Sequence, residues 1–144
     1  MLCQIEKLKK EDLISVKDLL KDTGLPYEDV DEHADTFLSA KADDELIGAV
    51  GLEIWNDNAL LRSLVVKEQY RNDGIGGELY EKCIEMAKHN FIKKVGLLTT
   101  TAENFFSKRG FEKITGNEIP SFIKETKEFR VYCPSSSTIM FKKI

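Results

Sequence analysis

A turn with an arginine and closely spaced glycines is the segment of this chain best suited to chemistry. Arg71, Gly74 and Gly76 form the pattern Arg-x-x-Gly-x-Gly, directly after an apolar stretch and directly before an amphipathic one. Glycine lets the backbone come close to an anion, and the first amides of a helix have no intrahelical acceptors. The pattern therefore predicts a phosphate-binding turn between a strand and a helix.

Two other nucleotide-binding motifs fit this segment less well. A P-loop needs Lys followed by Ser or Thr at its end, and no such pair follows Gly76. A Rossmann fingerprint needs a third glycine at the position where Leu79 stands. A helix start that uses its glycines only for the turn is the simpler alternative.

Composition limits the classes of protein to which the chain can belong. It has 144 residues, 42% hydrophobic and 32% charged, which suits one domain spanning residues 1–144. The net charge of -4 argues against a nucleic-acid partner. Three cysteines without Cys-x-x-Cys spacing predict neither a disulfide framework nor a zinc site. No apolar run approaches the roughly 20 residues of a membrane span, and no signal-peptide pattern opens the chain, so we expect a cytoplasmic protein without membrane contact.

Hydrophobic periodicity predicts the elements that must position the turn. The segment 27–35 is expected to be a loop or a short helix, and 116–136 to be polar and less regular. A strand, the helix after Gly74 and a further strand make a crossover, so strands 59–66 and 95–99 should be parallel neighbours. The expected strands are 3–8, 37–41, 46–55, 59–66, 95–99, 111–114 and 137–142, with further helices at 10–21 and 102–109.

These elements and motifs resemble the GCN5-related N-acetyltransferases, the acetyl-CoA-dependent GNAT superfamily. The turn at Arg71 resembles the pyrophosphate motif of that family, and residues 102–111, a helix ending in Gly-Phe, resemble its second signature. Runs at 49–53, 59–64, 97–102 and 126–129, with 133–136, are similar to its arsenic-resistance N-acetyltransferase subgroup. The resemblance implies an α/β (α+β) fold: a mixed, mostly antiparallel twisted sheet of about six to seven strands flanked by about four helices.

The resemblance also implies acetyl-CoA as cosubstrate, a small-molecule amine as acceptor, and no metal. Many members dimerise, so a homodimer is one state that the resemblance allows. Pantetheine would pair with the strand end and the pyrophosphate would bind the turn amides. The implied cofactor-binding residues are Leu64, Val65, Val66, Arg71, Asn72, Asp73, Gly74, Ile75, Gly76 and Gly77.

Acetyl transfer also needs a base for the ammonium group and a proton for the departing thiolate. Glu53, at the end of a strand, is the first candidate for the base; the alternatives are a solvent-facing strand end or an ion pair with Arg62. The family usually places a tyrosine as proton donor where this chain has Phe106. Tyr132 or Thr101 would then supply the hydroxyl, unless water or the amine itself supplies the proton.

Arg62 lies in the middle of an apolar strand, where a guanidinium needs an oxyanion partner. It would anchor the acidic end of an amino-acid substrate, or form an internal salt bridge with Glu53. Strand alternation puts Arg62 and Ser63 on opposite faces, so both reach one ligand only if the strand has a bulge. GNAT enzymes commonly have a bulge in this strand.

Further polar residues have a simpler structural interpretation beside the functional one. Thr99, Thr100 and Thr101 would contact substrate, although Thr100 or Thr101 as a helix N-cap is the simpler role. Cys133 suggests thiol–arsenic chemistry, but a structural role is simpler. His33 and His89 are expected at the surface. An acidic patch, expected to be solvated, comprises Asp29, Asp31, Glu32 and Asp35. At the mouth of the site it would instead favour a cationic amine, which conflicts with Arg62 as the anchor of an acidic substrate.

The sequence therefore predicts an N-acetyltransferase that uses acetyl-CoA to acetylate the primary amine of a small amino-acid-like substrate, with arsenical and phosphino analogues among the candidates. A protein N-acetyltransferase and a non-catalytic acetyl-CoA sensor are the alternatives.

Overall fold

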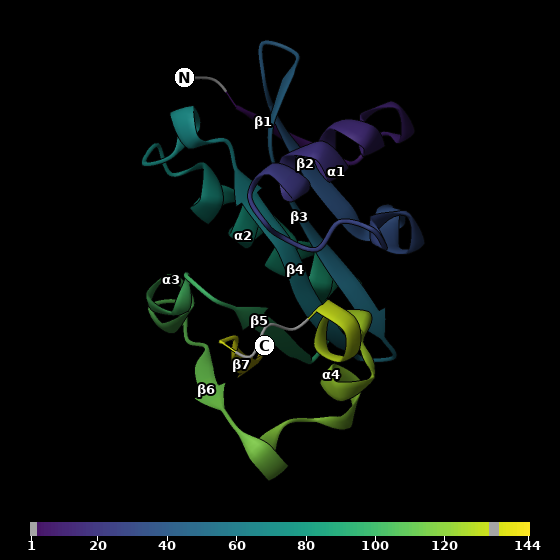
Figure 1. Ribbon diagram of the computed structural model, residues 1–144, viewed down its shortest axis with the longest axis vertical. Helices are drawn as coiled ribbons and strands as arrows, with labels where there is room; N and C mark the ends of the chain where they lie inside the picture. The colour runs from purple at the N-terminus through teal and green to yellow at the C-terminus, as the bar shows by residue number, and fades with distance from the viewer. Residues whose placement is uncertain (1–2, 133–135) are drawn as a thin grey trace. The chain divides into compact units, whose positions relative to one another are not determined.

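A computed structural model describes residues 3–132 and 136–144. Its strands form a seven-stranded sheet in the order β1-β2-β3-β4-β5-β7-β6 (Figure 1). The strands are β1 (Gln4–Lys7), β2 (Phe37–Ala42), β3 (Glu45–Trp55), β4 (Asn58–Val66), β5 (Lys94–Thr99), β6 (Glu112–Ile114) and β7 (Thr138–Lys143). The α-helices are α1 (Leu13–Asp22), α2 (Ile75–His89), α3 (Glu103–Ser107) and α4 (Ser121–Glu125).

The predicted fold class is confirmed, because the sheet is mixed and mostly antiparallel and helices accompany it. The chain divides into two compact units, which are described separately. The first unit comprises Met1–Glu53 and Leu61–Ala87, and the second comprises Ile54–Leu60 and Lys88–Ile144. A single domain over residues 1–144 stays a prediction.

In the first unit, β2 pairs antiparallel with both β1 and β3. Asp43 and Asp44, with φ of 50° and 67°, join β2 to β3. Two consecutive left-handed residues are typical of a tight hairpin turn, because that backbone matches the twist of the flanking strands. The two aspartates thus form the turn of an antiparallel hairpin between the strands predicted at 37–41 and 46–55.

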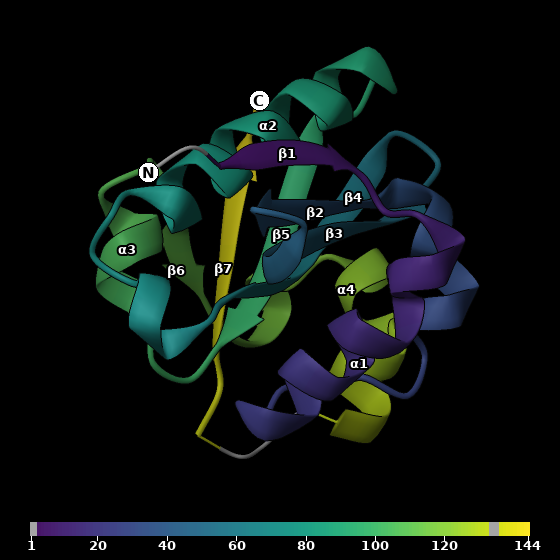
Figure 2. The same cartoon turned by 90° about the horizontal axis from the view of Figure 1, so that it is seen from above.

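Helices α1 and α2 cover opposite faces of the strands of the first unit (Figure 2). Val16 and Leu20 of α1 pack in one core cluster with Phe37, Ala49 and Val65. In β3, alternate residues share a face, so Gly51 and Glu53 point to the same side as Ala49. This is the face on which the polar cluster described below is built.

In the second unit, β4 and β5 are parallel and pair from Asn58 to Leu60 with Lys94 to Gly96, as the predicted crossover requires. Strand β7 lies between β5 and β6 and pairs antiparallel with both. The segment 116–136 is more regular than expected, since it contains α4. Phe122 and Ile123 of this helix are buried against Leu60, which explains why the helix forms in a mostly polar stretch.

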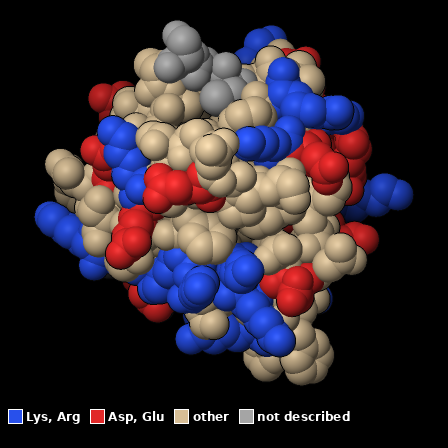
Figure 3. All heavy atoms as spheres, turned by 90° about the horizontal axis from the view of Figure 1, so that it is seen from below, with Lys and Arg blue, Asp and Glu red and all other residues tan. Residues whose placement is uncertain are grey.

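Acidic and basic side chains are intermixed on the face shown in Figure 3. This mixture agrees with a net charge of -4, made of 21 Lys and Arg against 25 Asp and Glu. Among the helices of residues 3–132 and 136–144, none has the length and apolar composition needed to cross a membrane.

Candidate functional site

The glycine turn leaves open space in front of the first turn of α2. Gly74 has a φ of 81°, a left-handed conformation that favours glycine, and its carbonyl accepts the amide of Glu78 at 3.1 Å. Among the described residues, a methyl group added at Gly74 would meet no heavy atom within 4 Å beyond its chain neighbours, and one at Gly76 would meet only Val66 Cγ2, at 3.9 Å. The turn therefore has room for an anion beside the amides of the helix start.

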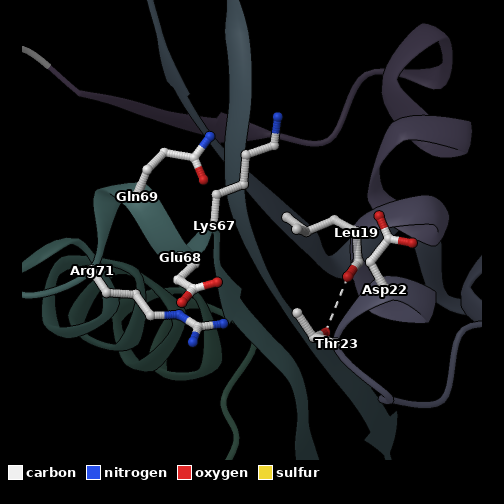
Figure 4. A pocket seen from close by; sticks show the side chains of 7 residues that line it. All are labelled: Leu19, Asp22, Thr23, Lys67, Glu68, Gln69 and Arg71. Carbon is white, nitrogen blue, oxygen red and sulfur yellow. Dashed lines mark hydrogen bonds between the residues drawn. The ribbon is translucent and has the colours of Figure 1, made fainter.

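Arg71 ties this turn to the end of β4. Its Nε donates a hydrogen bond to the Val66 carbonyl at 2.9 Å. Nearby, the Lys67 ammonium is paired with the Glu45 carboxylate at 2.9 Å. Both cations line a cavity of about 540 Å³. Figure 4 shows the lining residues on two sides. Leu19 and Asp22 of α1 and Thr23 directly after it lie on one side, and Lys67, Glu68, Gln69 and Arg71 from the segment after β4 lie on the other.

A buried ion-pair cluster is centred on Arg62, whose side chain is 0% exposed. Its Nη2 donates to Asp29 Oδ1 at 2.6 Å and its Nη1 donates to Asp29 Oδ2 at 2.8 Å. The same Nη1 donates to Glu53 Oε1 at 3.3 Å. The predicted internal salt bridge between Arg62 and Glu53 is therefore present, and Asp29 is the closer partner of the guanidinium.

The backbone of β4 brings Arg62 and Ser63 together. Ser63 has a φ of 61°, which interrupts the regular alternation of the strand in the manner of a bulge. As a result Arg62 Nε donates to Ser63 Oγ at 3.2 Å. The guanidinium carbon also lies 6.0 Å from the centre of the Phe37 ring. Both predicted substrate-binding residues of β4 thus reach one polar cluster.

His33 is the fourth member of the cluster. Its Nε2 lies 3.4 Å from Glu53 Oε1 and 3.8 Å from Asp29 Oδ2, and its side chain is 22% exposed. The 3-10 helix Val30–Thr36 carries it, and the Thr36 hydroxyl fastens this helix to β3 by donating to the Leu52 carbonyl.

Two expectations about this segment are wrong. Asp29 was expected in a solvated acidic patch but is buried, because Arg62 compensates its charge. His33 was expected at the surface but contacts two buried carboxylates. The one signal in the sequence was the four-residue spacing of Asp29 and His33, which can bring two side chains together on a helical segment.

The electrostatics of the cluster favour an ionised Asp29. Burial alone would raise the pKa of Asp29, but the hydrogen bonds and charge of Arg62, with a smaller contribution from His33, lower it below its usual value. One ligand atom each from Asp29, His33 and Glu53 lie within 4.8 Å of one another, a spacing that would suit a metal ion. Arg62 already donates to both carboxylates, so we interpret the cluster as an ion pair with its own internal cation.

The other predicted site residues occupy varied positions. Val65 and Val66 are buried at the end of β4 and Leu64 is half-buried, while Asn72 and Asp73 are exposed in the turn before α2. Ile75, Gly76 and Gly77 form the first turn of α2.

In the second unit, Thr99 Oγ1 accepts the amide of Ala102 at 2.9 Å, and Ala102 itself holds the N-cap position of α3. The expectation that Thr100 or Thr101 caps this helix is therefore wrong; both are exposed. Tyr132 is half-buried at the end of the π-helix Glu128–Tyr132. Cys133 lies outside the described residues.

Phe106 belongs to the core of the second unit. It is 4% exposed, and its ring packs edge-on against the rings of Phe105 and Phe111, with centroids 5.0 and 5.7 Å away. This position therefore offers an apolar ring where the resemblance places a tyrosine hydroxyl.

Comparison with known families decides the affiliation of the chain. The sequence profile of the acetyltransferase (GNAT) family matches residues 4–116, which include the glycine turn and the buried cluster. The chain belongs to the acetyltransferase (GNAT) family. This confirms the superfamily predicted from the motifs.

Among relatives, an amino-acid acetyltransferase from Aeromonas salmonicida is 27% identical to this GNAT chain over 119 residues, 76% of this chain. An uncharacterised N-acetyltransferase from Chlorobaculum tepidum is 31% identical over 97 residues, 67% of this chain. These matches span 27% and 62% of the two relatives, respectively. This chain thus corresponds to only part of either protein.

A solved structure shares the fold of this GNAT chain. N-acetylglutamate synthase from Neisseria gonorrhoeae, complexed with coenzyme A and N-acetyl-glutamate, superimposes with a TM-score of 0.84 at 22% identity. The match covers 99% of this chain and 35% of the synthase chain. At this identity the likeness establishes the fold.

Proposed function

We propose that this GNAT protein transfers the acetyl group of acetyl-CoA to the primary amine of a small amino-acid-like substrate. The observation that carries the proposal is the buried carboxylate of Glu53, in the same unit as an open glycine turn at a helix start. Acetyl-CoA needs the turn for its pyrophosphate, and an acceptor in the ammonium form needs a base.

In the proposed mechanism the turn amides from Arg71 to Gly77 bind the pyrophosphate, and the backbone of Leu64, Val65 and Val66 holds pantetheine. Glu53 accepts a proton from the acceptor ammonium, directly or through a water. The free amine attacks the thioester carbonyl, the C–S bond breaks, and the thiolate leaves with the second proton of the amine. Tyr132 or Thr101 would pass that proton on.

Two relatives support an amino acid as the acceptor class. One carries the name amino-acid acetyltransferase, and the Neisseria synthase was solved with N-acetyl-glutamate. An acidic end of such a substrate would meet Arg62 and Ser63, and Thr99 to Thr101 are the further proposed contacts. Both terminal nitrogens of Arg62 already donate hydrogen bonds to Asp29 or Glu53. We therefore propose that the Ser63 hydroxyl, which can rotate, makes the more adaptable contact with the substrate.

The test is release of free coenzyme A thiol from acetyl-CoA across a panel of amines. The panel contains the common amino acids, phosphino and arsenical glutamate analogues, and short peptides with free N-termini. Glu53→Gln keeps the size of the side chain and a hydrogen-bond acceptor but removes the base. We expect it to lower kcat/KM by about 10²- to 10⁴-fold, the usual contribution of general base catalysis.

Ser63→Ala is the better probe of substrate contact, because Arg62→Ala would leave two buried carboxylates without their cation. We expect Ser63→Ala to raise KM for the amine while the affinity for coenzyme A is unchanged. Wild-type kinetics in Glu53→Gln would contradict the role of Glu53 as the base. Turnover on peptides alone would mean that the acceptor is a protein N-terminus and not a free amino acid.

A non-catalytic acetyl-CoA sensor is the second candidate function. Phe106 favours it, since this buried ring cannot donate a proton to the thiolate. Calorimetric binding of acetyl-CoA with no thiol release on any amine would support the sensor and overturn the transferase.

A further inference from the structure

The four side chains of the buried cluster differ in their access to solvent. Arg62 and Asp29 have side chains 0% and 1% exposed, and that of Glu53 is 4% exposed. The imidazole of His33 is 22% exposed and lies 3.4 Å from Glu53 Oε1. His33 is thus the member of the cluster that touches both the proposed base and bulk water.

A buried base must lose the proton that it has accepted before it can serve the next turnover. Water reaches an exposed carboxylate directly, but Glu53 is almost fully enclosed. Within the cluster, Arg62 only donates hydrogen bonds, and it holds Asp29 in a two-point ion pair. Imidazole, in contrast, can accept a proton at one nitrogen and release one from the other.

We infer that the proton collected by Glu53 returns to solvent through the imidazole of His33. This inference rests on the proposed function, since it needs Glu53 to act as the base. The geometry that supports it is the direct contact of His33 Nε2 with Glu53 Oε1, at 3.4 Å, together with the partial exposure of the imidazole.

The proton balance of the step is simple. The ammonium of the acceptor gives one proton to the Glu53 carboxylate, and the resulting acid gives it to Nε2 of neutral His33. The imidazolium then loses the proton on Nδ1 to water or buffer. Proton exchange with solvent returns the imidazole to the tautomer with a free Nε2, which restores both groups. The second amine proton leaves with the thiolate, so each turnover releases one proton and one free thiol.

The charged groups that face His33 come from three elements. Asp29 precedes the 3-10 helix Val30–Thr36 that carries His33, Glu53 lies on β3, and Arg62 lies on β4. The four groups sum to one negative charge with neutral His33 and to zero with the imidazolium. Protonated Glu53 with neutral His33 gives the same sum of zero, so the transfer leaves the charge of the cluster unchanged. The imidazolium that results is stabilised by the neighbouring carboxylates of Asp29 and Glu53.

The deciding experiment compares steady-state kinetics of wild type, His33→Ala, His33→Gln and His89→Gln on the best amine of the panel. The chain has two histidines, and His89 is exposed at the end of α2, so His89→Gln is the matched control. Each variant is first checked by its urea unfolding midpoint. Imidazole is then added to each in increasing concentration.

Without His33, Glu53 would lose its proton more slowly after acetyl transfer. This slows the return of the enzyme to its starting state but does not affect binding of the amine or the transfer itself. We expect kcat of His33→Ala to fall about tenfold or more, a modest share of the usual acid–base effect, with kcat/KM for the amine nearly unchanged. Added imidazole should restore kcat in His33→Ala, while His89→Gln should behave as wild type. His33→Gln, which keeps a polar contact but cannot carry a proton, should be as slow as His33→Ala.

Three results would overturn the inference: wild-type kcat in His33→Ala, a loss that imidazole does not relieve, or recovery in His33→Gln. The last two would mean that His33 only maintains the structure. If wild type itself releases no thiol on any amine, the proposed function has failed, which is a separate result because it does not depend on the variants.

Discussion

Asp29 and Arg62 face each other in a buried two-point ion pair, with Nη2 to Oδ1 at 2.6 Å and Nη1 to Oδ2 at 2.8 Å. They are far apart in the sequence, so this pair fastens the loop before the 3-10 helix Val30–Thr36 to β4. A guanidinium and a carboxylate in this fork geometry make strong, directional hydrogen bonds. The pair therefore fixes the position of His33 and the orientation of Arg62 beside Glu53.

Asp29→Asn should destabilise the protein. The amide cannot balance the guanidinium, and a broken buried ion pair typically costs about 3–5 kcal/mol. Urea unfolding followed by circular dichroism measures the change in the free energy of unfolding.

Asp31→Asn is the matched control, two residues away. Asp31 pairs with Lys17 at 2.5 Å, but its side chain is 56% exposed, so its removal should hardly move the midpoint. Equal effects of the two substitutions would show that burial of the Asp29–Arg62 pair does not matter for stability.

The Asp29 pair should also give the protein a defined acid sensitivity. The pKa of Asp29 is lowered in the folded protein from a usual value of 3.8, so the unfolded chain takes up a proton at higher pH than the folded one. The stabilisation is therefore complete above the unfolded pKa and is lost as the pH falls through the folded pKa. The difference in unfolding free energy between wild type and Asp29→Asn should be constant above about pH 5 and shrink below about pH 4. A difference that does not change down to pH 2 would contradict this assignment.

The sequence was sufficient to predict the strands and the glycine turn because their signals are local. Alternating apolar residues, the aspartate pair at 43–44 and the spacing after Arg71 each act within a few residues. The buried cluster was only partly predictable. Arg62 in an apolar strand predicted an oxyanion partner for its guanidinium. The partner Asp29, however, lies in a polar segment whose sequence has no hydrophobic periodicity that would predict its burial. Only the fold reveals which distant carboxylate meets the guanidinium.

Gly76→Ala should separate cofactor binding from stability. The added methyl has room beside Val66 and sits in the first turn of α2, where alanine is the better helix former. It would also project into the space proposed for the pyrophosphate. We expect an unchanged or slightly higher thermal midpoint without ligand, and at least about tenfold weaker coenzyme A binding by calorimetry, equal to about 1.4 kcal/mol.

Glu81→Ala provides the comparison for Gly76→Ala, because Glu81 is an exposed residue further along α2. Its affinity for coenzyme A should equal that of wild type. Unchanged coenzyme A affinity in Gly76→Ala would remove the turn from the proposed cofactor site.

Gly96→Ala should destabilise the second unit. A methyl at this position of β5 would overlap the Ile123 side chain, which is fully buried. Overpacking of this kind costs about 1–3 kcal/mol. Adding Ile123→Val, which removes the overlapping Cδ1, should recover part of the loss in urea unfolding. A double variant less stable than either single variant would show that Gly96 and Ile123 do not compete for the same space.

The two described cysteines should differ in reactivity. Burial raises the pKa of the Cys83 thiol to about 12. Burial and the nearby Glu78 carboxylate also raise the pKa of Cys3, but this thiol is only half-buried. Cys83 should resist alkylation at pH 8 until urea unfolds the protein, while Cys3 should react in the folded state, as peptide mass spectrometry would record. Since the unfolded thiol ionises near pH 9, the contribution of Cys83 to stability should decline as the pH rises from about 9 toward 12. Rapid alkylation of Cys83 in the native protein would contradict its burial.

The place of β7 between β5 and β6 determines when this part of the sheet can form. Among the described strands, β6 pairs with β7 alone, although β6 is made first during synthesis. Until residues 138–143 arrive, the edge of β5 that faces β7 stays without its native partner, and an unpaired strand edge is a site for aggregation. We therefore expect a nascent chain stalled before Thr138 to bind chaperones. Removal of β7 would also leave β6 without its partner strand, because β7 lies between β5 and β6.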